Sequence, residues 1–267
     1  MSIDILSLWN FSDPAESENR FRTALAGATP EEDFILWTQI ARTHGLRKDF
    51  DTAKQILSGM ESRIPSRGQE GFVRYLLELG RTHCSPAHPE GTVTDESRFL
   101  ARNSYRVAFT LASEAKLDYL AVDALHMQAI IEPDLEKQIL WNERALAYMS
   151  ESDQPDAKKW EGSLRNNLGY ALKDAHRYDE ALEQFEQALA VRERAGQQPQ
   201  IRIAKWMIAN TLRLSGRNQE ALEIQLELEK ECEVIGETDN YVFQELEQIY
   251  RAIGDPVKAD TYAAKHR

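Results

Sequence analysis

Apolar residues recur every three or four positions through most of the chain, which is the spacing of one face of an α-helix. Between positions 164 and 175 they are Leu164, Leu168, Ala171, Leu172 and Ala175. A polar break at His176-Arg177 precedes a second stripe of the same kind over 178–189. Two amphipathic helices with so short a join must lie antiparallel and in contact.

The same plan of helix, turn and helix recurs along the chain. Further copies cover 37–57, 75–112, 124–149, 208–231 and 246–266, and the copy at 75–112 contains a Pro/Gly/Ser/Thr-rich insertion at about 83–95. Gly169 lies inside the first helix of its copy, where glycine costs about 1 kcal/mol relative to alanine. We expect another helix to approach closely there.

Residues 1–30 lie outside the repeating pattern. Asp13 followed by Pro14 is typical of a helix N-cap with proline at the first helical position. The residues before it are too apolar for a free tail: Ile5, Leu8, Trp9 and Phe11. Since the terminal unit of a solenoid needs a cover, we predict a capping segment at 1–30 and a repeat domain at 31–267.

The pattern over roughly residues 31–267 resembles the tetratricopeptide repeat, whose unit of about 34 residues reads W-x2-L-G-x2-Y…A-x3-F…P. The best copy matches this pattern at Leu168, Gly169, Ala181, Phe185 and Ala188. In that copy Arg165 replaces the Trp, Leu172 replaces the Tyr and the closing Pro is absent, whereas Trp37 holds the Trp place in the first copy.

The resemblance implies an all-α, right-handed superhelical solenoid of about six helix pairs, with an N-terminal capping helix. It also implies a non-enzymatic adaptor or scaffold, because in this family the first helices line a concave groove that holds a partner's extended peptide. A regulatory protein that senses a short peptide is the alternative within the same fold.

Composition narrows the choice of partners. The formal net charge of −12 over 267 residues argues against nucleic acid and against an anionic membrane surface. The chain has no apolar run of about 18 residues, and Asp4 precedes its first short apolar run without a basic residue. With only two cysteines, Cys84 and Cys232, a reducing cytoplasmic location is the simplest expectation.

Candidate chemistry is sparse. The chain has no nucleophile motif, dinucleotide fingerprint or phosphate loop, so we expect no catalytic residue and no cofactor. His83, Cys84 and His88 could belong to a metal site, and a metal-dependent enzyme is the remaining rival function. No second cluster supplies a fourth ligand, so we predict no metal and interpret this stretch as a polar loop.

One set of polar residues points away from the apolar stripes. Asn166, Tyr170 and Lys173 are spaced i, i+4, i+7, and the corresponding places in later copies hold Trp206, Asn210 and Arg213, then Gln244, Gln248 and Arg251. Arg42 and Arg81 in the early copies extend the basic row, and Asn167 fits one place of the family's carboxylate clamp, whose basic members do not line up here. Stacked repeats would join these residues into one groove.

Amides suit peptide backbone groups and arginines suit carboxylates, so we predict a protein or peptide partner with acidic or carboxylate-bearing character. The alternative for the basic row is local. Lys173, Arg213 and Arg251 each lie in the last turn of a predicted helix, where a cation complements the helix dipole by about 0.3–1 kcal/mol.

Overall fold

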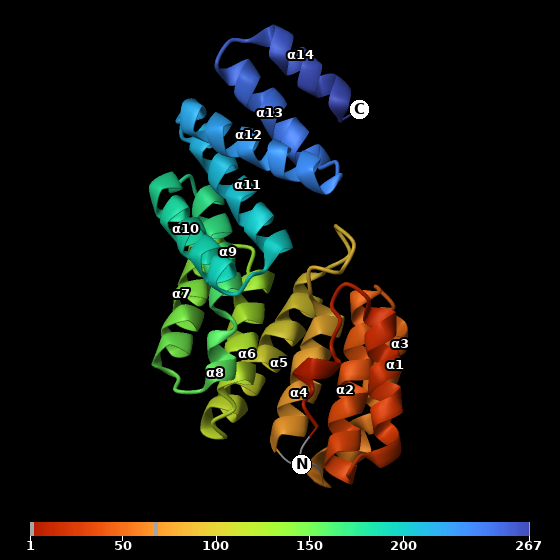
Figure 1. Cartoon of the computed structure of the whole chain (residues 1–267). Coiled ribbons are helices and arrows are strands. Elements are labelled where there is room, and N and C mark those ends of the chain that lie inside the picture. Colours follow the sequence, from red (N-terminus) through yellow and green to blue (C-terminus); the bar gives the residue numbers. More distant parts are fainter. Residues whose placement is uncertain (1–2, 67–68, 267) are drawn as a thin grey trace. The chain divides into compact units, whose positions relative to one another are not determined.

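The computed structural model describes residues 3–66 and 69–266, and no β-strand occurs among them. The chain divides into two compact units, unit 1 at Met1–Trp160 and unit 2 at Glu161–Arg267. In each unit, consecutive helices pack side by side (Figure 1). The predicted all-α class is confirmed.

Unit 1 contains α1 (Pro14–Ala24), α2 (Pro30–Leu46), α3 (Phe50–Met60), α4 (Gln69–His83), α5 (Asp95–Glu114), α6 (Asp118–Ile131), α7 (Leu135–Glu151) and the short α8 (Pro155–Lys158). Its described residues also form the 3-10 helices η1 (Leu6–Leu8), η2 (Leu25–Gly27) and η3 (Glu61–Ser66). Helix α2 contacts α4 as well as α3, and α4 contacts α6 as well as α5. The first helices of successive pairs therefore form a layer of their own.

Unit 2 contains α9 (Glu161–Asp174), α10 (Tyr178–Arg194), α11 (Gln198–Leu214), α12 (Asn218–Ile235), α13 (Asn240–Ala252) and α14 (Pro256–Lys265). Each helix packs on the next, and α11 also touches α13. The predicted pairs all occur in the described residues, as α2/α3, α4/α5, α6/α7, α9/α10, α11/α12 and α13/α14.

Six of the joins between described helices have one form: three residues, of which the middle one has a left-handed backbone. The middle residues are Lys48, Lys116, His176, Gly196, Gly216 and Gly254, with φ between 55° and 85°. At each join the third residue donates its N–H to a carbonyl five positions earlier, as Arg217 does to Leu212 at 2.9 Å. This is the Schellman helix ending, which satisfies carbonyls that the last turn leaves free.

The predicted close approach at Gly169 is confirmed. A Cβ atom added to Gly169 of α9 would lie 2.6 Å from Cε1 of Phe185, a fully buried ring on α10. Unit 1 has the same construction, because a Cβ at Gly80 of α4 would lie 2.5 Å from the ring of Tyr105 on α5. In both pairs, a flat aromatic ring occupies the space that a glycine leaves free.

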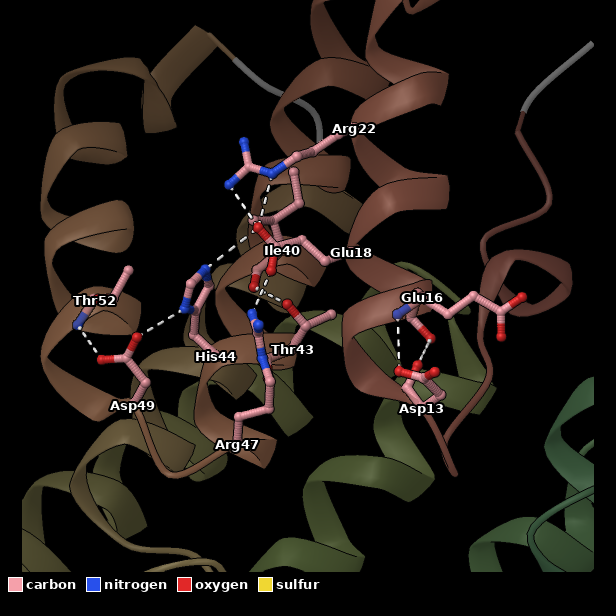
Figure 2. Close-up of polar contacts among 11 residues, drawn as sticks. Asp13, Glu16, Glu18, Arg22, Ile40, Thr43, His44, Arg47, Asp49 and Thr52 are labelled. Carbon is pink, nitrogen blue, oxygen red and sulfur yellow. Dashed lines mark hydrogen bonds and ion pairs between the residues drawn. The ribbon is translucent and has the colours of Figure 1, made fainter.

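The N-terminal helix begins as predicted, with Asp13 as N-cap and Pro14 in the first turn. Helix α1 is tied to α2 by Glu18, whose carboxylate contacts Arg47 and lies 3.5 Å from His44 Nε2 (Figure 2). The other ring nitrogen of His44 lies 3.0 Å from Asp49, the residue that caps α3. The division into a capping segment at 1–30 and one repeat domain at 31–267 remains a prediction.

Candidate binding surfaces

Helix α9 is the first helix of its pair, and the predicted site residues on it differ in how far their side chains are exposed. Tyr170 is 37% exposed and its ring meets the Phe185 ring edge-on at 5.8 Å. The Lys173 ammonium lies 5.0 Å from the centre of the Tyr170 ring and 3.5 Å from the carboxylate of its own neighbour, Asp174. Asn166 and Asn167 are both half-buried.

On α11, the predicted residues are held by α13. Trp206 is half-buried and donates its indole N–H to the Tyr241 carbonyl at 3.0 Å. Asn210 is buried and donates to Glu245 at 2.9 Å. Arg213 contacts both oxygens of the same carboxylate, at 2.6 and 3.3 Å. Glu245 thus neutralises the Arg213 guanidinium from the neighbouring helix.

On α13, Gln248 is exposed, as is Gln244 one turn earlier. Arg251 forms ion pairs with Glu247 at 2.9 Å and with Asp260 of α14 at 3.3 Å. The structure therefore brings Asn210 and Arg213 together on Glu245, holds Trp206 against Tyr241, and leaves the amides of α13 open to solvent.

In unit 1, the predicted residues Arg42 and Arg81 belong to a largely buried charge network on the first-helix layer. Arg81 of α4 contacts Glu78 at 2.6 Å and Asp123 of α6 at 2.5 Å. Arg42 of α2 reaches the same two carboxylates only at 3.9 and 4.0 Å. Both carboxylates are buried.

Burial and the neighbouring charges shift the pKa values of the titratable groups in this network. Burial raises the pKa of Glu78, because desolvation outweighs the attraction of Arg81 and Arg42. Burial also acts to raise the pKa of Asp123. The attraction of Arg81 and Arg42 is stronger there than the effect of burial, and it holds the pKa of Asp123 below its ordinary value. His126, one turn along α6, has its pKa lowered to about 4 by burial.

The acidic partners Glu78, Asp123 and Glu245 were not among the predicted site residues. Each sits inside an apolar run or stripe: Glu78 between two leucines, Asp123 within LAVDAL, and Glu245 next to Leu246. A carboxylate on a buried face requires a compensating partner. That signal in the sequence could have predicted that each carboxylate has a cationic partner, but not which arginine supplies it.

The loop after α4 directs its histidine inward. The His88 ring stacks on Phe50 at 3.8 Å, and its Nε2 lies 3.2 Å from the Thr82 carbonyl oxygen. Cys84 is buried, and burial raises the pKa of its thiol. Residues 3–66 and 69–266 contain no group of three His, Cys, Asp or Glu side chains able to hold a metal ion. None of the described helices is long and apolar enough to cross a membrane.

Comparison with models of known protein families finds a match in the middle of the chain. Residues 160–229, which run from the end of unit 1 through α9, α10, α11 and most of α12, match the model of the tetratricopeptide repeat. The sequence has no match among curated proteins.

Solved structures of similar fold include a Signal Transduction ATPase with Numerous Domains from Pyrococcus horikoshii that has a tetratricopeptide repeat sensor. It is 12% identical with a TM-score of 0.71, and the match covers 95% of this chain but 38% of that protein. At this identity the likeness concerns the fold alone.

Two further structures superpose loosely. BtubC (BKLC) from P. vanneervenii is 16% identical with a TM-score of 0.47, and the match covers 99% of this chain and 90% of that one. The complex of the TPR2AB domain of yeast Sti1 with pHSP90 is 11% identical with a TM-score of 0.28, covering 95% and 92%. TM-scores below 0.5 give these two no weight for the fold.

Proposed function

We propose that this chain, whose residues 160–229 match the tetratricopeptide repeat, is a non-enzymatic adaptor that binds an extended segment of a partner protein on the first-helix layer of unit 2. The observation that carries the proposal is the exposed polar and aromatic face of α9 and α13. It presents Tyr170, Gln244, Gln248 and, at 69% exposure, Tyr241. Amides of this kind can pair with the backbone of an extended peptide.

The charge of the partner depends on which cations remain available. Arg213 is matched by the buried Glu245 carboxylate, and Arg251 by half-buried Glu247 and exposed Asp260, so neither offers a full charge to a ligand. Among the described residues, the Lys173 ammonium meets one carboxylate, that of the adjacent Asp174 at 3.5 Å, and lies over the Tyr170 ring. We therefore assign the contact with an acidic or carboxylate-bearing segment to Lys173, with Tyr170 beside it.

Affinity capture from the native lysate tests the proposal, with Lys173→Glu as the perturbing variant. Exposed Lys230, on a second helix, gives the matched control Lys230→Glu. We expect Lys173→Glu to lose the captured partner, and the control to keep it. Lys173 is half-buried but still open to solvent, so capture by the wild type should weaken as salt rises, since charges near the surface are screened over about 10 Å at 0.1 M.

Arg213 is unsuitable for this test. Replacing it by Glu would place a second carboxylate beside buried Glu245, and breaking a buried pair costs about 3–5 kcal/mol. Loss of capture would then report unfolding. If Lys173→Glu retains every partner at wild-type levels, the binding surface lies elsewhere and the proposal fails.

A further inference from the structure

The N-terminal segment, residues 3–12, lies lengthwise along one face of α2. At one end the Ile3 backbone N–H donates to Glu32 at 3.0 Å, and further along the Trp9 indole N–H donates to the Gln39 side chain at 3.1 Å. Glu32 and Gln39 are seven positions apart, so they share a face of the helix. The segment and α2 therefore run in the same direction.

The segment ends on Arg42, three positions beyond Gln39 and one of the predicted partner-binding residues. The rings of Trp9 and Phe11 stack on each other at 4.7 Å, and both lie over the Arg42 guanidinium, at 5.4 and 5.5 Å. The Arg42 Nε atom is buried without a hydrogen-bond partner in the described residues. An aromatic pair covers this cation, whose carboxylate neighbours Glu78 and Asp123 lie at 3.9 and 4.0 Å.

The segment is only half embedded. Ile5 is buried against an apolar cluster that includes Ile35 of α2, whereas Asp4 and Ser7 face solvent and Phe11 is 56% exposed. Its only regular structure is the single 3-10 turn η1. The segment is also held by α1, because the Trp9 ring meets Phe21 edge-on at 5.0 Å and the Asn10 N–H donates to Ser17 at 2.8 Å. Its irregular backbone and exposed side chains are properties of segments that open at lower cost than packed helices.

A pocket of about 370 Å³ remains beside the segment, so the segment does not fill the space available. The pocket is bounded by the segment itself, by Glu32 and Ile35 of α2, by Glu70 and Arg74 of α4, and by Leu117, Tyr119 and Leu120 at the start of α6. A longer ligand on the face of α2 could extend into it.

We infer that this face of α2 and the adjoining pocket form a peptide-binding groove, in which residues 3–12 are a resident occupant that a partner segment displaces. The resident segment defines the partner's chemistry: an extended peptide with two aromatic residues two positions apart and an aliphatic residue four positions before the first. This deepens the proposed function and rests on it, because it gives unit 1 a binding groove of its own.

Because residues 3–12 are covalently joined to the groove, they should compete with any separate peptide that binds there. A segment joined to its own groove acts at an effective concentration in the millimolar range, so the wild-type chain should bind the same sequence weakly when it is supplied as a separate peptide. Weakening the resident segment should expose the groove and strengthen that binding.

The probe is a labelled peptide of residues 3–12, IDILSLWNFS, titrated by fluorescence anisotropy against the full-length chain. We expect the Trp9→Ala/Phe11→Ala chain to bind it at least about ten-fold more tightly than the wild type. Adding Arg42→Ala should abolish the gain. The matched control is Phe99→Ala, since Phe99 on α5 is 57% exposed and lies outside the segment; it should leave binding unchanged.

A second measurement needs no variant. Millimolar unlabelled peptide should raise deuterium uptake of residues 3–12 in the wild-type chain, because it displaces them. Equal binding by wild type and double variant, no binding by either, or unchanged uptake would each overturn the inference and leave the segment a fixed structural cover. Lys173→Glu should bind the peptide like the wild type, so failure of the unit 2 proposal would remain distinguishable.

Discussion

Gly169→Ala tests whether the glycine–aromatic contact holds the α9/α10 pair together. The added Cβ would lie 2.6, 2.8 and 2.9 Å from three atoms of the Phe185 ring, whereas carbon atoms at rest are about 3.5–4.0 Å apart. The ring is fully buried, so it must move by most of an ångström against packed neighbours. Overpacking of this kind costs about 1–3 kcal/mol.

Helix propensity acts in the opposite direction, since alanine is favoured over glycine by about 1 kcal/mol inside a helix. We expect a net loss of up to about 2 kcal/mol, seen as a fall of up to roughly 8 °C in the thermal melt followed by circular dichroism. Gly45→Ala is the matched control. Its Cβ would meet only Phe50 at 3.9 Å, an ordinary contact, so that variant should gain stability.

The contact itself is isolated by a double-mutant cycle with Phe185→Leu. Removing the ring should relieve the clash, so the two changes together should cost less than their sum by about 1 kcal/mol or more. If Gly169→Ala melts higher than the wild type, as Gly45→Ala should, the ring yields freely and the reasoning is refuted.

Two further predictions concern buried polar groups. Because burial lowers the pKa of His126 to about 4 while the unfolded imidazole titrates near 6.5, the unfolded state takes up the proton first; unit 1 should lose about 2–3 kcal/mol as the pH falls from 7 to 4. Urea titrations at several pH values should show that His126→Gln loses less unfolding free energy between pH 7 and pH 4 than the wild type does. The same pH dependence in both proteins would contradict this. Gln225 of α12 is fully buried, and neither amide atom has a hydrogen-bond partner in the part of the chain described, so Gln225→Met should raise stability by about 1–2 kcal/mol. A lower melting temperature would show that the amide is satisfied.

The fold could be predicted largely from the sequence, because each helix pair is encoded locally. The apolar stripes, the Asp13-Pro14 start and the glycine at 169 all act within a few residues or across one short turn. Contacts between pairs depend on which faces stacking brings together. No local pattern states that Arg213 will meet Glu245 or that Arg81 will meet Asp123.

The N-terminal segment illustrates the same limit. Its apolar residues predict that it packs on the protein, but not that Trp9 and Phe11 lie over Arg42. The capture and peptide experiments test whether the predicted site residues bind a partner. Their positions show which of their charges are already matched within the chain.

The repeated three-residue join also makes the chain modular. Deleting residues 178–217, which removes α10 and α11, would attach the His176-Arg177 ending of α9 directly to Asn218 at the start of α12. The new join keeps its left-handed middle residue, so the chain should continue in the same helical register. A shortened or lengthened relative could therefore be engineered by whole blocks of this size, whereas an insertion of a few residues within a helix would shift every later face.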